Sequence, residues 1–346
     1  MNSKYKIAIQ FGALHGINDF IAGFLLSSLS LTNVDVKTNT IAFLMYSVIA
    51  FGGQLPAGIV VDKSKNIKLY TIIAIVCMLL AIIISYESVF YAILLSAVAS
   101  AFIHVCGGAA CYLSDRKSST LAGVFASPGV LGLITGGILA STSFQYFYVL
   151  IPILLLLLLM IIKTKLPIYN AMEKQTENAI LETHDFFMLI LLLAIAFRSL
   201  LWNVMHMMCF NDTTWLLSIG VAASSGKLVG GYLSDKVNWK RFVFISMFLS
   251  VLLLNLGKEN IWLFALGVAL LQSAVPITLL LMQQYMRNSP AVATGLSLGL
   301  AIVLAGLPTY IQQFREIQGH KIFILLLSIV FLISNFLIIR KKEVSA

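Results

Sequence analysis

The chain has 346 residues, of which 60% are hydrophobic and only 11% are charged. A typical soluble domain is about 45–50% apolar and about 25% charged, so this composition excludes a soluble globular fold and predicts a protein surrounded by lipid. The net charge of +9 does not indicate nucleic-acid binding, because the lysines and arginines lie in short loops between apolar runs, where they act as topology signals.

Twelve apolar runs are long enough to cross a membrane, which takes about 20 residues of α-helix. The first follows the basic segment MNSKYK and is too long for the core of a signal peptide, so we expect an uncleaved first span. The sequence therefore predicts an all-α integral membrane protein. The predicted spans are 7–31, 40–61, 69–86, 89–113, 119–140, 144–163, 186–209, 213–234, 241–257, 260–285, 290–311 and 321–339.

The basic residues predict how these spans are oriented. If the N-terminus is cytoplasmic, seventeen of the 23 lysines and arginines fall on the cytoplasmic side, and four (Lys37, Lys258, Arg315 and Lys321) fall on the opposite side. Positive charge is enriched in cytoplasmic loops, so we expect both termini in the cytoplasm. The remaining two (23 − 17 − 4 = 2), Arg198 and Lys227, lie inside predicted spans.

The ends of the second and eighth predicted spans carry the same motif. The segments are GQLPAGIVVDK at 53–63 and GKLVGGYLSDK at 226–236, related by an offset of 173 (226 − 53), which is half of 346. This repeat predicts two pseudo-symmetric six-helix halves in the same orientation, at 1–163 and 186–346, joined by a cytoplasmic linker at 164–185. The matched residues are Gly53, Leu55, Gly58, Asp62 and Lys63 in the first copy and Gly226, Leu228, Gly231, Asp235 and Lys236 in the second.

The chemistry of this motif is mechanical. Its glycines allow neighbouring helices to approach closely, and its aspartate can accept hydrogen bonds from the N-terminus of an adjacent helix. Its lysine can pair across the loop. Glycine-rich helix ends followed by charges occur in many membrane bundles, but two copies half a chain apart favour a cytoplasmic gate that opens and closes. This gate motif comprises Gly53, Gly58, Asp62, Lys63, Gly226, Gly231, Asp235 and Lys236.

Asp19 lies about twelve residues into the first predicted span, close to the membrane midplane. Ionisable residues at this depth usually mark ion or substrate pathways. His15 lies one helical turn earlier on the same face, so we expect the two residues to form a proton site. The alternative is a purely structural aspartate that pairs inside the bundle.

Three further polar residues are candidates for substrate binding. Arg198 lies in the middle of the seventh span, where it can bond to Asp19, bind an anionic substrate, or serve structure alone. His104 in the fourth span either lines the pathway or bonds to a neighbouring helix, and Asn203 is a candidate for the cavity wall. For Lys227 we expect a side chain that extends towards the cytoplasmic surface.

A copper site is the alternative that the soft ligands suggest. Thioether, thiolate and imidazole groups suit Cu(I), but consecutive helical residues point in different directions and methionine is a common packing residue. We therefore expect no bound metal and no cofactor. The residues concerned are Met205, His206, Cys209, Met282 and Met286.

The two GxLxxGxxxDK segments resemble the signature loop of the major facilitator superfamily. Within it, LHGINDFIAGFL in the first span, PGVLGLITGG with Gly129, Gly132 and Gly136, and FRSLL with Arg198 resemble fosmidomycin-resistance-type exporters. The resemblance covers the whole chain. It implies a twelve-helix transporter of the inner membrane and favours export.

The expected function is proton-coupled secondary transport of a small molecule by a monomer, with the substrate site near the midplane between the halves. No nucleotide-binding loop or hydrolase motif is present in the sequence, so ATP-driven transport and an enzyme activity are not supported. A metal-ion importer of the same fold and a membrane sensor or scaffold remain the alternatives.

Overall fold

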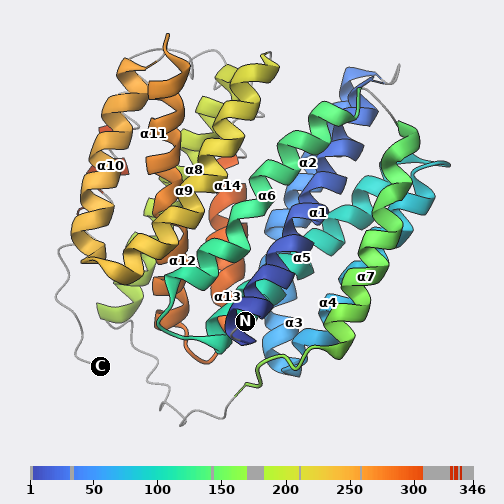
Figure 1. Cartoon of the computed structure of the whole chain (residues 1–346), viewed down its shortest axis with the longest axis horizontal. Coiled ribbons are helices and arrows are strands. Elements are labelled where there is room, and N and C mark those ends of the chain that lie inside the picture. Colours follow the sequence, from blue (N-terminus) through green and yellow to red (C-terminus); the bar gives the residue numbers. More distant parts are fainter. Residues whose placement is uncertain are drawn as a thin grey trace.

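The computed structural model describes residues 3–31, 35–141, 144–169, 183–209, 212–257 and 259–306, with a few positions between 328 and 336. Within these residues every regular element is helical (Figure 1). The elements of residues 1–163, which we call the N-half, are α1 (Ser3–Leu31), α2 (Val36–Ser47), η1 (Val48–Gly52), α3 (Gln54–Ser64), α4 (Ile67–Ile84), α5 (Val89–Ser114), α6 (Ser119–Leu139), η2 (Phe144–Val149) and α7 (Leu150–Lys163). Those of residues 186–346, the C-half, are α8 (Thr183–Cys209), which begins in the linker, α9 (Thr213–Lys236), α10 (Trp239–Leu256), α11 (Ile261–Ser273), α12 (Val275–Tyr285), α13 (Pro290–Thr294), η3 (Gly295–Leu300) and α14 (Ala301–Gly306).

Eleven of the twelve predicted spans coincide with helical segments. Nine segments of the described chain are long and apolar enough to cross a membrane, and two shorter apolar helices, Phe147–Lys163 and Pro290–Gly306, occupy the sixth and eleventh predicted spans. The predicted twelfth span, 321–339, lies outside the described residues apart from isolated positions. The prediction of an all-α, multi-pass membrane protein is confirmed.

Some spans differ in detail from the uniform helices that the sequence predicts. The span predicted at 40–61 starts earlier, at Val36, because Asp35 caps α2 by accepting from the Thr38 N–H at 2.9 Å. It also contains the π-helical turn η1. The span predicted at 260–285 is divided at Ala274 into α11 and α12, since Pro276 has no N–H to bond to the Gln272 carbonyl.

Glycines bring α1 and α6 together along their lengths. A Cβ atom on Gly132 would collide with the carbonyl of Gly16, and one on Gly136 would collide with the carbonyl of Phe20. Small residues at these positions let the two backbones approach closely, as in other membrane helix pairs. The contact fixes α6 beside the middle of α1, where His15 and Asp19 lie.

The two halves lie side by side and share a central contact. In Figure 1 the elements α1 to α7 (blue to green) lie on the right and α8 to α11 (yellow to orange) lie on the left. Where the two groups meet, α6 of the N-half packs against α9 of the C-half. Helix α13 of the C-half packs against α3 and α5 of the N-half. The site described below lies between these two groups of helices.

Candidate functional site

The first copy of the repeated motif joins the N-half to the C-half. Asp62, at the end of α3, accepts hydrogen bonds from the backbone N–H of Ala291 at 3.1 Å and of Val292 at 2.8 Å, in the first turn of α13. The Tyr169 hydroxyl donates to the same carboxylate at 2.8 Å. Burial and then the neighbouring Asp62 raise the pKa of Tyr169, so the phenol stays protonated as the donor.

The second copy makes the reciprocal contact. Asp235, at the end of α9, accepts from the backbone N–H of Ser119 at 2.8 Å and of Thr120 at 2.9 Å, at the start of α6. Hydroxyl groups of Ser118, Ser119 and Thr120 donate to it at 2.5–2.9 Å. A carboxylate is stabilised at a helix N-terminus because the unpaired N–H groups and the helix dipole both favour negative charge.

Glycines allow these contacts to form. A Cβ atom on Gly58 would lie 2.7 Å from the carbonyl oxygen of Ala291, and one on Gly231 would lie 2.7 Å from that of Ser119. Each glycine is one helical turn before its aspartate, so a glycine and an aspartate meet the same helix N-terminus. We call the two contacts the Asp62 latch and the Asp235 latch.

The other motif residues have different roles. Gly226 packs against the carbonyl of Ala269 within the C-half, and Gly53 has its own helix carbonyl, that of Ile49, beside it. The predicted pairing of the motif lysines is absent in the described residues: Lys236 lies over the Tyr232 ring at 5.8 Å, and Lys63 forms no ion pair there. Both side chains are exposed in the last turn of their helix.

Two glutamines add to the closure beside the latches. Gln283 donates from Nε2 to the Gly108 carbonyl and to the Thr294 hydroxyl, each at 3.0 Å. Gln284 donates to the Arg116 carbonyl at 3.3 Å. We call the side that carries both latches the basic side, since most lysines and arginines are predicted to lie there. The two halves are therefore bonded to each other on this side.

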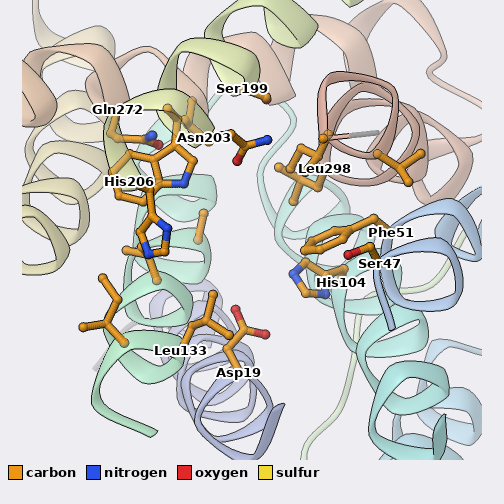
Figure 2. Close-up of a pocket in the computed structure, with 18 of the residues that line it drawn as sticks. Asp19, Ser47, Phe51, His104, Leu133, Ser199, Asn203, His206, Gln272 and Leu298 are labelled. Atoms are coloured by element: carbon orange, nitrogen blue, oxygen red, sulfur yellow. The ribbon is translucent and has the colours of Figure 1, made fainter. Parts of the chain in front are cut away.

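A cavity of about 630 Å³ lies between the halves (Figure 2). It is lined from both, with Asp19, Ser47, Phe51 and His104 from the N-half and Ser199, Asn203, His206, Gln272 and Leu298 from the C-half among the labelled residues. Three predicted site residues, Asp19, His104 and Asn203, are thus brought to one space. His15 and Arg198 also line it.

His15 and Asp19 form an ion pair or hydrogen bond at the cavity wall. The Nδ1 atom of His15 lies 3.0 Å from the Phe125 carbonyl oxygen, and a carbonyl only accepts, so Nδ1 carries a proton. The Nε2 atom lies 3.2 Å from Asp19 Oδ2. That contact is attractive only when a second proton lies on one of the two atoms. Asn18 donates to the other Asp19 oxygen at 2.9 Å.

Gly129 makes room for this pair. A Cβ atom at this position would collide with His15 Nε2 and lie 2.7 Å from Asp19 Oδ2. Any larger side chain on this face of α6 would therefore displace the pair. The glycine was recognised in the sequence, but only as part of a series and not as a wall of the site.

His104 lies next to the pair. Its Nδ1 atom is 2.7 Å from the Ser100 carbonyl oxygen, and its ring centroid is 4.4 Å from that of His15. Ring nitrogens and a carboxylate oxygen of His15, Asp19 and His104 lie within 4.8 Å of one another, a spacing that also suits a divalent cation. Chelation therefore belongs among the controls for any proton assignment.

The predicted copper ligands are not gathered at one point. Met205 and Cys209 lie in one packed cluster of the C-half, and Met282 and Met286 lie in another. His206 lines the cavity instead. Within the part of the chain that the structure describes, these five side chains do not converge.

Arg198 and Lys227 bring positive charge to the cavity. Arg198 is only 5% exposed and donates from one nitrogen to the Thr278 hydroxyl at 2.9 Å, not to Asp19. The suggested Asp19–Arg198 bond is therefore absent. Lys227 lines the cavity, whereas we expected it to reach towards the basic surface. The signal in the sequence was the break in the repeat, which has the uncharged Gln54 at the matching position.

No protein-family model matches the sequence, and no curated protein is significantly similar to it. Solved structures are similar in fold. The E. coli fucose:proton symporter FucP, as a variant, matches with a TM-score of 0.73 and 12% identity over 99% of this chain and 100% of that chain. A major facilitator superfamily transporter structure of FucP in the outward conformation matches with a TM-score of 0.73 and 14% identity, over the same shares.

A human protein shows the same likeness. The organic anion transporter MFSD10 (TETRAN) matches with a TM-score of 0.68 and 15% identity, over 98% of this chain and 100% of that chain. At such identities the likeness concerns the fold. Together with the repeated motif and the two latches, it shows that this multi-pass membrane protein has the fold of the major facilitator superfamily.

Proposed function

We propose that this protein is a secondary active transporter that moves a small molecule across the cytoplasmic membrane by alternating access, coupled to protons. The observation that carries the proposal is the cavity between the two halves, with the His15–Asp19 pair in its wall and both latches closed on one side of it. A central site between two halves that rock against each other is how parallel-repeat transporters work.

The latches supply the moving part. Each consists of a few hydrogen bonds between the halves, so it can break and re-form at modest cost. With the basic side cytoplasmic, as the charge distribution predicts, the closed latches correspond to an outward-facing state. The similarity to FucP in its outward conformation supports this interpretation.

The His15–Asp19 pair supplies the proton site. When its shared proton leaves, the ring nitrogen presents a lone pair to an ionised carboxylate, and the two groups repel each other. Because His15 is also bonded to the Phe125 carbonyl of α6, the change is transmitted from α1 to α6. The other titratable groups that face the cavity are His104 on α5, Arg198 and His206 on α8, and Lys227 on α9.

The remaining parts of the proposal come from the sequence. The resemblance to fosmidomycin-resistance-type exporters favours export by proton antiport, and the positive-inside pattern places both termini in the cytoplasm. We take the monomer as the functional unit. Asn203 and His104 are proposed to contact substrate from opposite halves.

Growth of a sensitive bacterial host on toxic compounds tests this function. Cells would express wild type, Asp19→Asn or neither at matched membrane levels, on a panel of fosmidomycin, cationic drugs and copper salts. Resistance that wild type confers and Asp19→Asn does not would support export through this site. Everted vesicles with a pH-sensitive dye would then show whether addition of the exported compound dissipates the proton gradient. A chelator would be added to exclude a metal effect.

The outcomes separate the alternatives. Sensitisation by wild type indicates import, and a response confined to copper would favour the methionine ligands. If Asp19→Asn behaves like wild type on a compound that wild type transports, the proton site is wrong.

A further inference from the structure

The charges that line the cavity do not balance. Among the described lining residues there are two strong bases, Arg198 and Lys227, and one acid, Asp19. When His15 and Asp19 share a proton, the pair has no net charge, and the two positive charges of Arg198 and Lys227 remain. When the proton leaves, one positive charge still remains. The described wall of the cavity is therefore positive in both states.

Neither base makes an ion pair in the described residues, and Asp19, the one acid of the described wall, acts on Lys227 only at longer range, without a direct contact. Arg198 has one hydrogen bond, to a neutral hydroxyl, and its guanidinium offers five donors. Lys227 has no hydrogen bond or ion pair there. A charged group taken out of water is costly unless it is paired, so unpaired bases in a membrane helix bundle indicate a charge that arrives from outside.

The two bases come from adjacent helices of the same half. Arg198 lies on α8 and Lys227 on α9, whereas the proton pair lies on α1 in the other half. An anion bound by the bases would thus be held by the C-half and would face the histidines of the N-half. Apolar and aromatic side chains, including Phe43, Phe51, Leu133 and Trp202, cover much of the remaining wall.

We propose that the substrate is a small organic anion, a carboxylate or phosphonate with an apolar body, whose charged group is bound by Arg198 and Lys227. A guanidinium matches two oxygens of such a group at once, while an ammonium acts as a point charge. A cavity of about 630 Å³ is in the range of sites that bind molecules of drug-like size. This inference rests on the proposed transport function and gives the substrate class of the same cavity.

Thermal stability of the purified full-length protein in detergent tests the charge of the ligand. The probes are compounds with one aromatic skeleton and different charged groups: benzoate, phenylacetate, benzylphosphonate, benzamide, benzyl alcohol and benzylamine. We expect the anions alone to raise the melting temperature of wild type. Lys227→Gln should weaken their apparent affinity about 10-fold or more, as expected for the loss of a charge-assisted bond, and Lys227→Arg should retain most of it.

The control variant is Lys163→Gln, which makes the same change of charge at an exposed position outside the cavity. Stabilisation by the amine or the neutral compounds, an equal response of Lys227→Gln and wild type, or no response to any anion would each overturn the proposal. These results are independent of the growth assay. If cells show Asp19-dependent resistance but the protein binds no anion, the proposed substrate class is wrong and the transport function stands. If anions bind but nothing is transported, the proposed transport function is wrong and the anion site stands.

Discussion

The basic-side closure and the central cavity are built on different plans. The closure is symmetric: Asp62 and Asp235 make the same kind of bond to the N-termini of α13 and α6, with a glycine one turn earlier in each case. The cavity is asymmetric, because the N-half brings the His15–Asp19 pair and the C-half brings Arg198 and Lys227. Two equivalent latches suit a motion in which both halves take part. A proton pair in one half and two bases in the other suit the binding of a proton and an anionic substrate.

The largest effect should come from Gly129→Ala, which tests the cavity side of this comparison. The new Cβ would collide with His15 and crowd Asp19, so the two side chains could no longer share a proton in their present geometry. We expect proton-coupled flux in vesicles to fall on the order of 100-fold, as for other small displacements of reacting groups. Gly137→Ala on the same helix is the control, since its Cβ would meet a flexible serine hydroxyl at 3.1 Å. Similar loss in both variants would contradict the pair's role.

The next effect tests the closure. Gly58→Ala puts a Cβ 2.7 Å from the Ala291 carbonyl oxygen and 2.9 Å from the Val292 Cα, and backbone atoms cannot move aside cheaply. Overpacking of this kind costs about 1–3 kcal/mol, here only in the closed state, so the ratio of closed to open molecules should fall about 5- to 150-fold. Distances between spin labels at Lys163→Cys and Arg241→Cys would report it. An unchanged distance distribution would show that the Asp62 latch does not control opening.

A smaller effect should distinguish the two latches from each other. Asp235 accepts two backbone and three hydroxyl hydrogen bonds, whereas Asp62 accepts two backbone bonds and one from Tyr169. Removing a helix-capping carboxylate costs about 1 kcal/mol, which changes the ratio of closed to open molecules by a factor of about five. We expect Asp235→Ala to open the basic side more than Asp62→Ala, by the same label distances.

The control for both is Asp35→Ala. It removes a cap from α2 within the N-half, where Asp35 accepts from Thr38, and it breaks no bond between halves. A shift of the label distances in Asp35→Ala as large as in the latch variants would show that helix fraying, and not the latch, moves the equilibrium.

The smallest effect concerns a basic-side ion pair that does not join the halves. Burial alone would raise the pKa of Asp115, but the hydrogen bond from Lys4 at 2.6 Å and the Lys117 N–H outweigh it and hold the pKa below its ordinary value. A lowered folded-state pKa stabilises the protein above about pH 4 and loses that contribution as the pH falls through it. Lys4→Ala should therefore lower the melting temperature slightly at pH 7, and the difference from wild type should persist to about pH 4 and shrink as the pH falls from about 4 to about 2. A difference that stays constant over this range would exclude the pair.

Much of the fold could be predicted from the sequence, because spans are set by apolar length and the halves by the repeat. Asp62 and Asp235 were found since the motif occurs twice. The rotation of each helix about its axis could not be predicted, and it decides that Lys227 lines the cavity and that Arg198 bonds to Thr278. The Phe125 carbonyl, which orients His15, is a backbone group that no pattern of side chains reveals.

The donors in both latches include backbone amides at the second and third positions of α13 and the first two of α6. Every amino acid except proline supplies such an amide, and the proline of α13, Pro290, occupies the first position, whose N–H the carboxylate does not use. Side chains at 291 and 292 can therefore vary without loss of the donors to Asp62. In homologous sequences the aspartates should be retained and proline should be absent from these donor positions, while burial limits residue 291 and the hydroxyl bonds to Asp235 favour serine or threonine at 119 and 120.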